Sequence, residues 1–255
     1  MPHLFTSIII FIIGLVIGSF SNVCIYRIPR HESVISPGSH CPNCGKPVRP
    51  IDNIPVLSYL LLMGKCHYCG KNISLQYPFV ELLTGLLYLL IFLTFDLTID
   101  TLAYIMLASV LIIITFIDLK ESIIPDILSL PMIGIGFIFS FFLSKITYID
   151  SLLGILTGGG SLLIIAIMGS FLFKKEAMGG GDIKLAAMIG AFLGWKLTLL
   201  TLFIGFFAGA IIGTIFMIMK QKKENEAIPF GPFIALGSII ALFWGEMMIE
   251  WYLFL

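Results

Sequence analysis

The 255-residue chain carries little charge. Only 12% of its residues are Asp, Glu, Lys or Arg, about half the share found in a typical soluble domain. Fifteen basic and fifteen acidic side chains cancel, so no net positive charge favours binding to nucleic acid. Hydrophobic residues make up 58% of the chain, and its mean hydropathy is +1.06. These values exclude a water-soluble globule and a disordered chain, and they indicate a polytopic membrane protein.

Eight apolar runs are candidates for membrane spans, since a spanning helix needs about 17–25 mostly apolar residues. The first run lacks the basic flank and cleavage site of a signal peptide, so we interpret it as a retained anchor. The sixth run is short and predicts a tilted, broken or re-entrant segment. We therefore predict an all-α membrane protein with about eight transmembrane helices. The runs are 4–26, 78–95, 101–118, 123–143, 151–173, 183–194, 197–219 and 232–255.

Basic residues gather in alternate connecting segments. If the segment after the first span is cytoplasmic, all Lys and Arg residues except Lys145 and Lys196 lie on or next to that side. The positive-inside rule then predicts that both termini lie outside. A seven-span alternative that omits the short sixth run would place Lys220, Lys222 and Lys223 outside. The predicted cytoplasmic segments are 27–77, 119–122, 174–182 and 220–231.

Four of the five cysteines form two C-x2-C pairs, each followed directly by glycine. Four thiolates in this spacing suit tetrahedral zinc. Because the insert is too small for its own hydrophobic core, a metal would contribute folding energy. A cytoplasmic location argues against disulfides, although free or redox-active pairs remain an alternative. We predict a small zinc-binding domain at 27–77, between a first helix at 1–26 and a membrane domain at 78–255. The four ligands are Cys41, Cys44, Cys66 and Cys69.

Three aspartates stand at the predicted cytoplasmic ends of spans. Asp118 ends the third span, Asp126 begins the fourth, and Asp182 follows three consecutive glycines. Ionisable residues in such places are functional candidates, and a glycine run lets the backbone approach a substrate strand. Another acidic residue, Glu81, is interpreted as a carboxylate that favours the N-terminus of its helix. The three glycines are Gly179, Gly180 and Gly181.

Two converging carboxylates can share one proton, so that one acts as a base on water and the other as an acid toward the scissile peptide group. The chain has no H-E-x-x-H motif of a zinc protease and no G-x-S-x-G motif of a serine hydrolase. Aspartic protease chemistry is therefore the proteolytic mechanism that the residues support.

In this order of motifs the chain resembles the prepilin peptidases, which are intramembrane aspartic proteases with a GxGD motif. The resemblance covers nearly the whole chain. It implies an enzyme of the bacterial cytoplasmic membrane that removes the basic leader from type IV prepilins or pseudopilins at the cytoplasmic face. It also implies methylation of the new N-terminal residue with S-adenosylmethionine. The matching segments are 18–29, the paired C-x2-C loop, Asp118 with 124–126, 179–185 and 229–233.

Carried over residue by residue, the catalytic pair of this family falls on Asp118 and Asp182. Asp126 belongs to the first aspartate motif but receives a supporting role, because Pro125 predicts that it lies on a different helix from Asp118. The three glycines and Lys184 are further supporting candidates. No soluble Rossmann pattern marks a site for S-adenosylmethionine, so that site is not predicted. The expected partners are the prepilin substrate and the lipid bilayer.

Three other functions remain open from the sequence. A transporter or channel with a zinc-sensing loop is disfavoured because the acids cluster at one membrane face and no repeat symmetry is visible. A scaffold protein with a zinc knuckle is disfavoured because Asp118 and Asp182 are both present. A peptidase without methyltransferase activity is the third, and the mass of the mature N-terminus distinguishes it.

Overall fold

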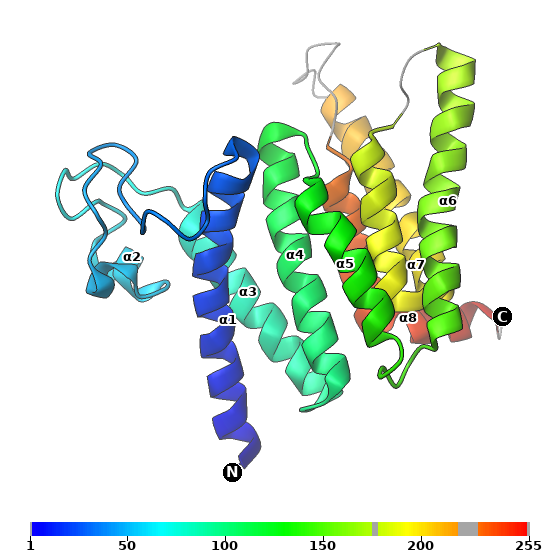
Figure 1. The fold of residues 1–255 in the computed structure, drawn as a ribbon, viewed down its shortest axis with the longest axis horizontal. Helices are drawn as coiled ribbons and strands as arrows, with labels where there is room; N and C mark the ends of the chain where they lie inside the picture. The colour runs from blue at the N-terminus through cyan, green and yellow to red at the C-terminus, as the bar shows by residue number, and fades with distance from the viewer. Residues whose placement is uncertain (1, 175–177, 219–228, 254–255) are drawn as a thin grey trace. The chain divides into compact units, whose positions relative to one another are not determined.

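A computed structural model describes residues 2–174, 178–218 and 229–253 (Figure 1). Throughout these ranges the regular structure is helical. The only β pairing among them is two isolated bridges, so the predicted all-α class is confirmed. The helices are α1 (Pro2–Arg27), α2 (Leu57–Leu61), α3 (Gln76–Phe95), α4 (Ile99–Glu121), α5 (Asp126–Phe139), α6 (Tyr148–Phe173), α7 (Gly180–Ile218) and α8 (Gly231–Leu253), with 3-10 turns η1 (Ile28–Arg30) and η2 (Pro50–Asn53).

Six helices of the described residues are long and apolar enough to cross a membrane: α1, α3, α4, α6, α7 and α8. The predicted count of eight spans is not confirmed. The predicted run 123–143 contains α5, whose 14 residues rise only about 21 Å, less than the bilayer core. The predicted runs 183–194 and 197–219 fall in the single element α7, whose helix is interrupted at Gly194 (φ 72°, ψ 172°). Lys220, Lys222 and Lys223, which the topology argument uses, lie outside the described residues.

The chain divides into two compact units. Unit 1 comprises the chain up to Thr101 together with Ala108–Ile113, and unit 2 comprises Leu102–Leu107 and the chain from Ile114 onward. Unit 1 therefore contains the cysteine loop, α1 and α3. Unit 2 contains the ends of the helices that carry Asp118, Asp126 and Asp182.

In unit 1, α1 and α3 pack backbone to backbone. A Cβ atom at Gly14 would lie 2.7 Å from the Cα of Gly85, and one at Gly18 would lie 2.7 Å from the Cα of Glu81. Only glycine leaves room for this approach. One turn after Gly18, the Asn22 Nδ2 donates a hydrogen bond to the carbonyl of Tyr77 on α3 at 3.1 Å. Gly18 and Asn22 lie in the segment 18–29, one of those in which the chain resembles the prepilin peptidases.

In unit 2, glycines set the distance between α6 and α7. A Cβ atom at Gly190 would overlap the carbonyl oxygen of Gly154. Beside this contact, the buried Ser151 hydroxyl donates to the carbonyl of Ala191 at 2.7 Å. On the other side of α7, Gly136 of α5 leaves space for the ring of Phe192. These contacts at residues 190–192 hold α7, whose first turn carries Asp182, against α5 and α6.

Candidate active site and metal centre

Asp118 lies in the last turn of α4 and is only 5% exposed. Its Oδ2 accepts a hydrogen bond from the backbone N–H of Gly231 at 3.0 Å. Gly231 is the first residue of α8, where backbone N–H groups have no partner within the helix. The beginning of α8 thus supplies a donor that holds the Asp118 carboxylate in one orientation.

Asp182 lies in the first turn of α7 and is half-buried. Its carboxylate is close enough to Asp118 for the two negative charges to repel each other. Its backbone N–H donates to the carbonyl of Gly179 at 3.2 Å, which closes the turn before the helix. The two aspartates, 64 positions apart in the sequence (182 − 118), therefore lie within electrostatic range of each other at the ends of their helices.

Ile124 fills the space between these helix ends. A Cβ atom at Gly181 would lie 2.8 Å from the Cβ of Ile124, and one at Gly231 would lie 3.3 Å from its Cδ1. The segment before α5 thus touches the beginnings of both α7 and α8. Sequence reasoning did not assign Gly231 or Ile124 to the site, although both fall in segments that resemble the family motifs.

Asp126 does not share this arrangement. It is the exposed first residue of α5, whereas Asp118 ends α4. The Nζ of Lys184 lies 2.7 Å from each of its carboxylate oxygens. Lys184, which the sequence places two residues after Asp182, is therefore bound to Asp126. Gly180 has open space around its Cα, with nothing within 4 Å of a built Cβ.

The four predicted metal ligands come together in the loop of unit 1. Their Sγ atoms all lie within 4.8 Å of one another, and those of Cys41 and Cys69 are 3.9 Å apart. A tetrahedral zinc ion with Zn–S bonds of about 2.3 Å needs sulfurs about 3.8 Å apart, so the cluster fits a metal such as zinc with little adjustment.

The two C-x2-C pairs adopt the same backbone shape. In each, the glycine after the second cysteine donates to the carbonyl of the first at 2.9 Å, with φ of 68° at Gly45 and 67° at Gly70. Each pair is also closed by one antiparallel bridge, His40 with Pro47 and Lys65 with Asn72. The loop therefore contains two copies of one knuckle, a structure in which glycine permits the left-handed turn.

The electrostatics of the cluster favour a thiolate at Cys66. Backbone N–H groups of Cys69 and Tyr68 hydrogen-bond to its sulfur and lower the pKa of this thiol to about 7. At Cys69, the Lys71 N–H also lowers the pKa, but desolvation and the neighbouring cysteines outweigh it and raise the value to about 11. A bound cation would favour the deprotonated form of all four thiols, because metal ligation requires deprotonated sulfurs.

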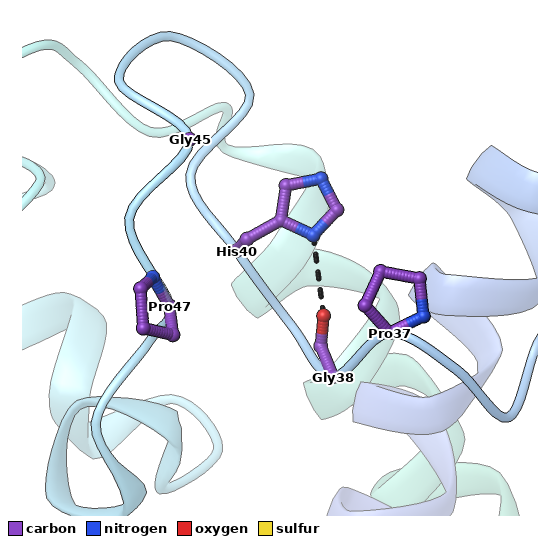
Figure 2. A pocket seen from close by; sticks show the side chains of 5 residues that line it. All are labelled: Pro37, Gly38, His40, Gly45 and Pro47. Carbon is purple, nitrogen blue, oxygen red and sulfur yellow. Dashed lines mark hydrogen bonds between the residues drawn. The ribbon is translucent and has the colours of Figure 1, made fainter.

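Side chains around the knuckles support the loop. Arg49 donates to both carboxylate oxygens of Asp52, from Nε at 2.7 Å and from Nη2 at 3.0 Å, and the same Nη2 lies 3.0 Å from Nδ1 of His67. The hydrogen bond from Arg49 lowers the pKa of the Asp52 carboxyl. Figure 2 shows His40 with its Nδ1 directed at the Gly38 carbonyl, 3.2 Å away. An open depression of about 430 Å³ surrounds it, lined by Pro37, Gly38, His40, Gly45 and Pro47.

The sequence suggested that Glu81 stabilises the N-terminus of its helix, but α3 begins at Gln76, so Glu81 is its sixth residue and lies beyond the first turn. Its Oε2 accepts a hydrogen bond from the backbone N–H of Val56 at 2.7 Å, and the residue is 7% exposed. This carboxylate therefore joins α3 to the turn before α2.

Comparison with known proteins gives the family. The model described as Bacterial Peptidase A24 N-terminal domain matches residues 12–95, and the one described as Type IV leader peptidase family matches 105–214. A protein of Aeromonas salmonicida named Prepilin leader peptidase/N-methyltransferase is 35% identical over 99% of this chain and 95% of its own length. The chain belongs to the type IV leader peptidase family. The resemblance found in the sequence is thereby confirmed.

Two further relatives carry the same name as the Aeromonas protein. One from Pseudomonas aeruginosa is 35% identical over 95% of this chain and 91% of its own length. One from Legionella pneumophila is 34% identical over 98% of this chain and 95% of its own length. No solved structure matches the chain. Together with the six apolar helices, membership of this leader peptidase family identifies a multi-pass membrane protein.

Proposed function

We propose that this protein is an aspartic endopeptidase that removes the basic leader from type IV prepilins or pseudopilins. The observation that carries the proposal is the position of Asp118 and Asp182 at the ends of α4 and α7, around Ile124, with Asp118 buried. When two carboxylates lie close together, sharing one proton lowers the electrostatic repulsion between them. The ionised one takes a proton from the attacking water, and the protonated one donates toward the peptide group.

The glycine run before Asp182 suits an extended substrate strand. A helical peptide bond is protected by its own hydrogen bonds, so the substrate must unwind locally before it is cut. Gly179 and Gly180 are exposed, and nothing lies within 4 Å of a built Cβ at Gly180. A peptide backbone can therefore approach this segment and pair with it, as a peptide pairs with an exposed strand edge.

The ion pair between Lys184 and Asp126 supports the catalytic aspartates Asp118 and Asp182 without taking part in proton transfer. It ties the first turn of α7 to the first residue of α5. Asp126 thereby neutralises Lys184 and stays a supporting residue. Gly181 contributes by its close approach to Ile124.

The second activity is methylation of the new N-terminal residue, with S-adenosylmethionine as donor. It comes from the relatives, whose printed names include N-methyltransferase. Zinc is proposed as a structural ion on Cys41, Cys44, Cys66 and Cys69, because four thiolates leave no open position for a substrate. The alternative, a peptidase without methyl transfer, keeps the same Asp pair.

For the topology we propose eight spans in the bacterial inner membrane. Gly194 would divide α7 into the sixth and seventh spans, and α5 would be a short fourth span. Both termini would lie outside, with the cysteine loop and the Asp pair on the cytoplasmic side, as the Lys and Arg distribution favours. The functional division would be a first helix at 1–26, a zinc domain at 27–77 and a peptidase domain at 78–255.

The test is a cleavage assay with the purified full-length protein in liposomes. A prepilin with a basic leader and S-adenosylmethionine are added, and the product N-terminus is read by mass spectrometry. Leader loss with a gain of one methyl group is the expected result. Leader loss alone leaves the peptidase and rejects the methyltransferase, and no cleavage across several leaders favours a transporter or scaffold.

A further inference from the structure

Unit 1 contains a buried carboxylate that leader cleavage does not use. Glu81 on α3 is 7% exposed, and its Oε2 accepts the hydrogen bond from Val56 at 2.7 Å. Gly18 of α1 lies against the same residue, since a Cβ atom there would lie 2.7 Å from the Cα of Glu81. Three segments far apart in the sequence thus meet at one ionisable group. Because an ionisable residue within an apolar helix is expensive to bury, its presence indicates a function.

The backbone that binds Glu81 is strained. Val56 has φ 61° and ψ −50°, a conformation that a β-branched residue rarely adopts. Such strain persists only where surrounding contacts enforce it, and strained residues cluster at binding and catalytic sites. The bond from the Val56 N–H to Glu81 is one of these contacts.

Asn22 supplies an independent observation. Asn22 is 3% exposed, and its Nδ2 donates to the carbonyls of Tyr77 at 3.1 Å and Gly18 at 3.3 Å. Two acceptors around Nδ2 fix the orientation of the amide. Its Oδ1 is buried, and none of the described residues donates a hydrogen bond to it. A buried acceptor of this kind requires an explanation, and a ligand N–H provides one.

Asn22 and Glu81 belong to the same helix interface. Gly18 and Asn22 are one turn apart on α1, and Tyr77 and Glu81 are one turn apart on α3. Gly18 touches Glu81, and Asn22 is bonded to Tyr77, so the two polar groups lie in successive turns of one contact. A neutral carbonyl acceptor one helical turn from a carboxylate suits a primary ammonium group, which has several N–H donors and one positive charge.

We propose that Glu81 and Asn22 bind a primary ammonium group during methylation. Two molecules of that reaction carry one: the cleaved substrate, at its new N-terminus, and the methyl donor, in its amino-acid part. The inference rests on the proposed methyltransferase function, since leader cleavage alone has no need for such a site.

The experiment measures binding to the full-length protein in nanodiscs, with no reaction running. The probes are a short apolar peptide with a free N-terminal amine, the same peptide N-acetylated, and S-adenosylhomocysteine. The variants are Glu81→Gln, whose amide oxygen can still accept from Val56, and Asn22→Ala. The matched control is Ser21→Ala, because Ser21 is also buried on α1 and its hydroxyl donates within its own helix, to the Ile17 carbonyl. Bound zinc in unit 1 and leader cleavage in unit 2 check that both units of each variant are folded.

We expect wild type and Ser21→Ala to bind the free-amine peptide at least tenfold more tightly than the acetylated one. Glu81→Gln and Asn22→Ala should lose this preference while they still cleave leaders. If both variants instead bind S-adenosylhomocysteine at least tenfold more weakly than wild type, the ammonium group is that of the methyl donor. Unchanged binding of all probes in both variants would overturn the inference. A wild type that cleaves but never methylates would reject the proposed methyltransferase, which the methylation assay reports separately.

Discussion

Replacing Gly231 by alanine should disturb the Asp pair without removing either carboxylate. A Cβ atom at this position would lie 2.7 Å from Oδ2 of Asp118, whereas carbon and oxygen in ordinary contact lie about 3.3–3.6 Å apart. The carboxylate must therefore move by about 0.6 Å or more. Because a misplacement of about 1 Å can slow an enzyme about 100-fold, we expect kcat to fall roughly 10- to 100-fold. That loss corresponds to about 1.4–2.7 kcal/mol in the transition state.

The assay is steady-state leader cleavage by Gly231→Ala, with KM and thermal unfolding measured on the same preparation. The matched control is Gly134→Ala in α5, where nothing lies within 4 Å of a built Cβ. Gly134 lies inside α5, where alanine raises helix propensity by about 0.5–1 kcal/mol, whereas Gly231 is the first residue of α8. Thermal unfolding of both variants measures this difference in stability separately from kcat. We expect the control to keep its kcat. Equal kcat for Gly231→Ala and wild type would refute the argument that this contact orients Asp118.

Three further predictions concern packing, the ion pair and the metal. Gly190→Ala should lower stability by about 1–3 kcal/mol in thermal unfolding, because its Cβ overlaps the Gly154 carbonyl, and an unchanged midpoint would contradict this. Lys184→Asp should reduce cleavage severalfold with little change in stability, since an exposed ion pair contributes only about 0–1 kcal/mol. The double variant with Asp126→Lys should restore activity, and no rescue argues against a positioning role. Cys41→Ser should lose bound zinc, measured by elemental analysis, whereas Cys24→Ala should keep it. Wild type should release the metal as pH falls, because protonated thiols do not bind it, and retention at low pH would argue against four thiolate ligands.

Features set by local pattern were predicted from the sequence. The apolar runs gave the helical class, because spanning segments must satisfy their backbone polar groups internally. The spacing of the cysteines was sufficient to predict that Cys41, Cys44, Cys66 and Cys69 lie together, since each knuckle is built from consecutive residues. The motifs predicted Asp118 and Asp182 as a candidate pair, and both residues lie at ends of helices, as the sequence predicted.

Features that depend on contacts between distant segments were not predicted. The bond from Gly231 to Asp118 joins residues 113 positions apart, and no spacing rule connects them. The ion pair between Lys184 and Asp126 needed the packing of α5 on α7. Glu81 follows Pro78, which suggested a helix-dipole role, and only the fold brings Val56 to it. The interruption of α7 at Gly194 depends on a positive φ that glycine permits but does not require.

The central claim is that Asp118 and Asp182 act together on the scissile bond. Its most direct test compares leader cleavage by Asp118→Asn, Asp182→Asn and Asp126→Asn, each checked for folding by thermal unfolding. Proton transfer by a positioned side chain is worth about 10²–10⁴-fold, so we expect each of the first two variants to lose at least 100-fold in rate. Asp126→Asn should stay within tenfold of wild type. Normal cleavage by Asp118→Asn or Asp182→Asn, or an equal loss in Asp126→Asn, would contradict this assignment of the pair.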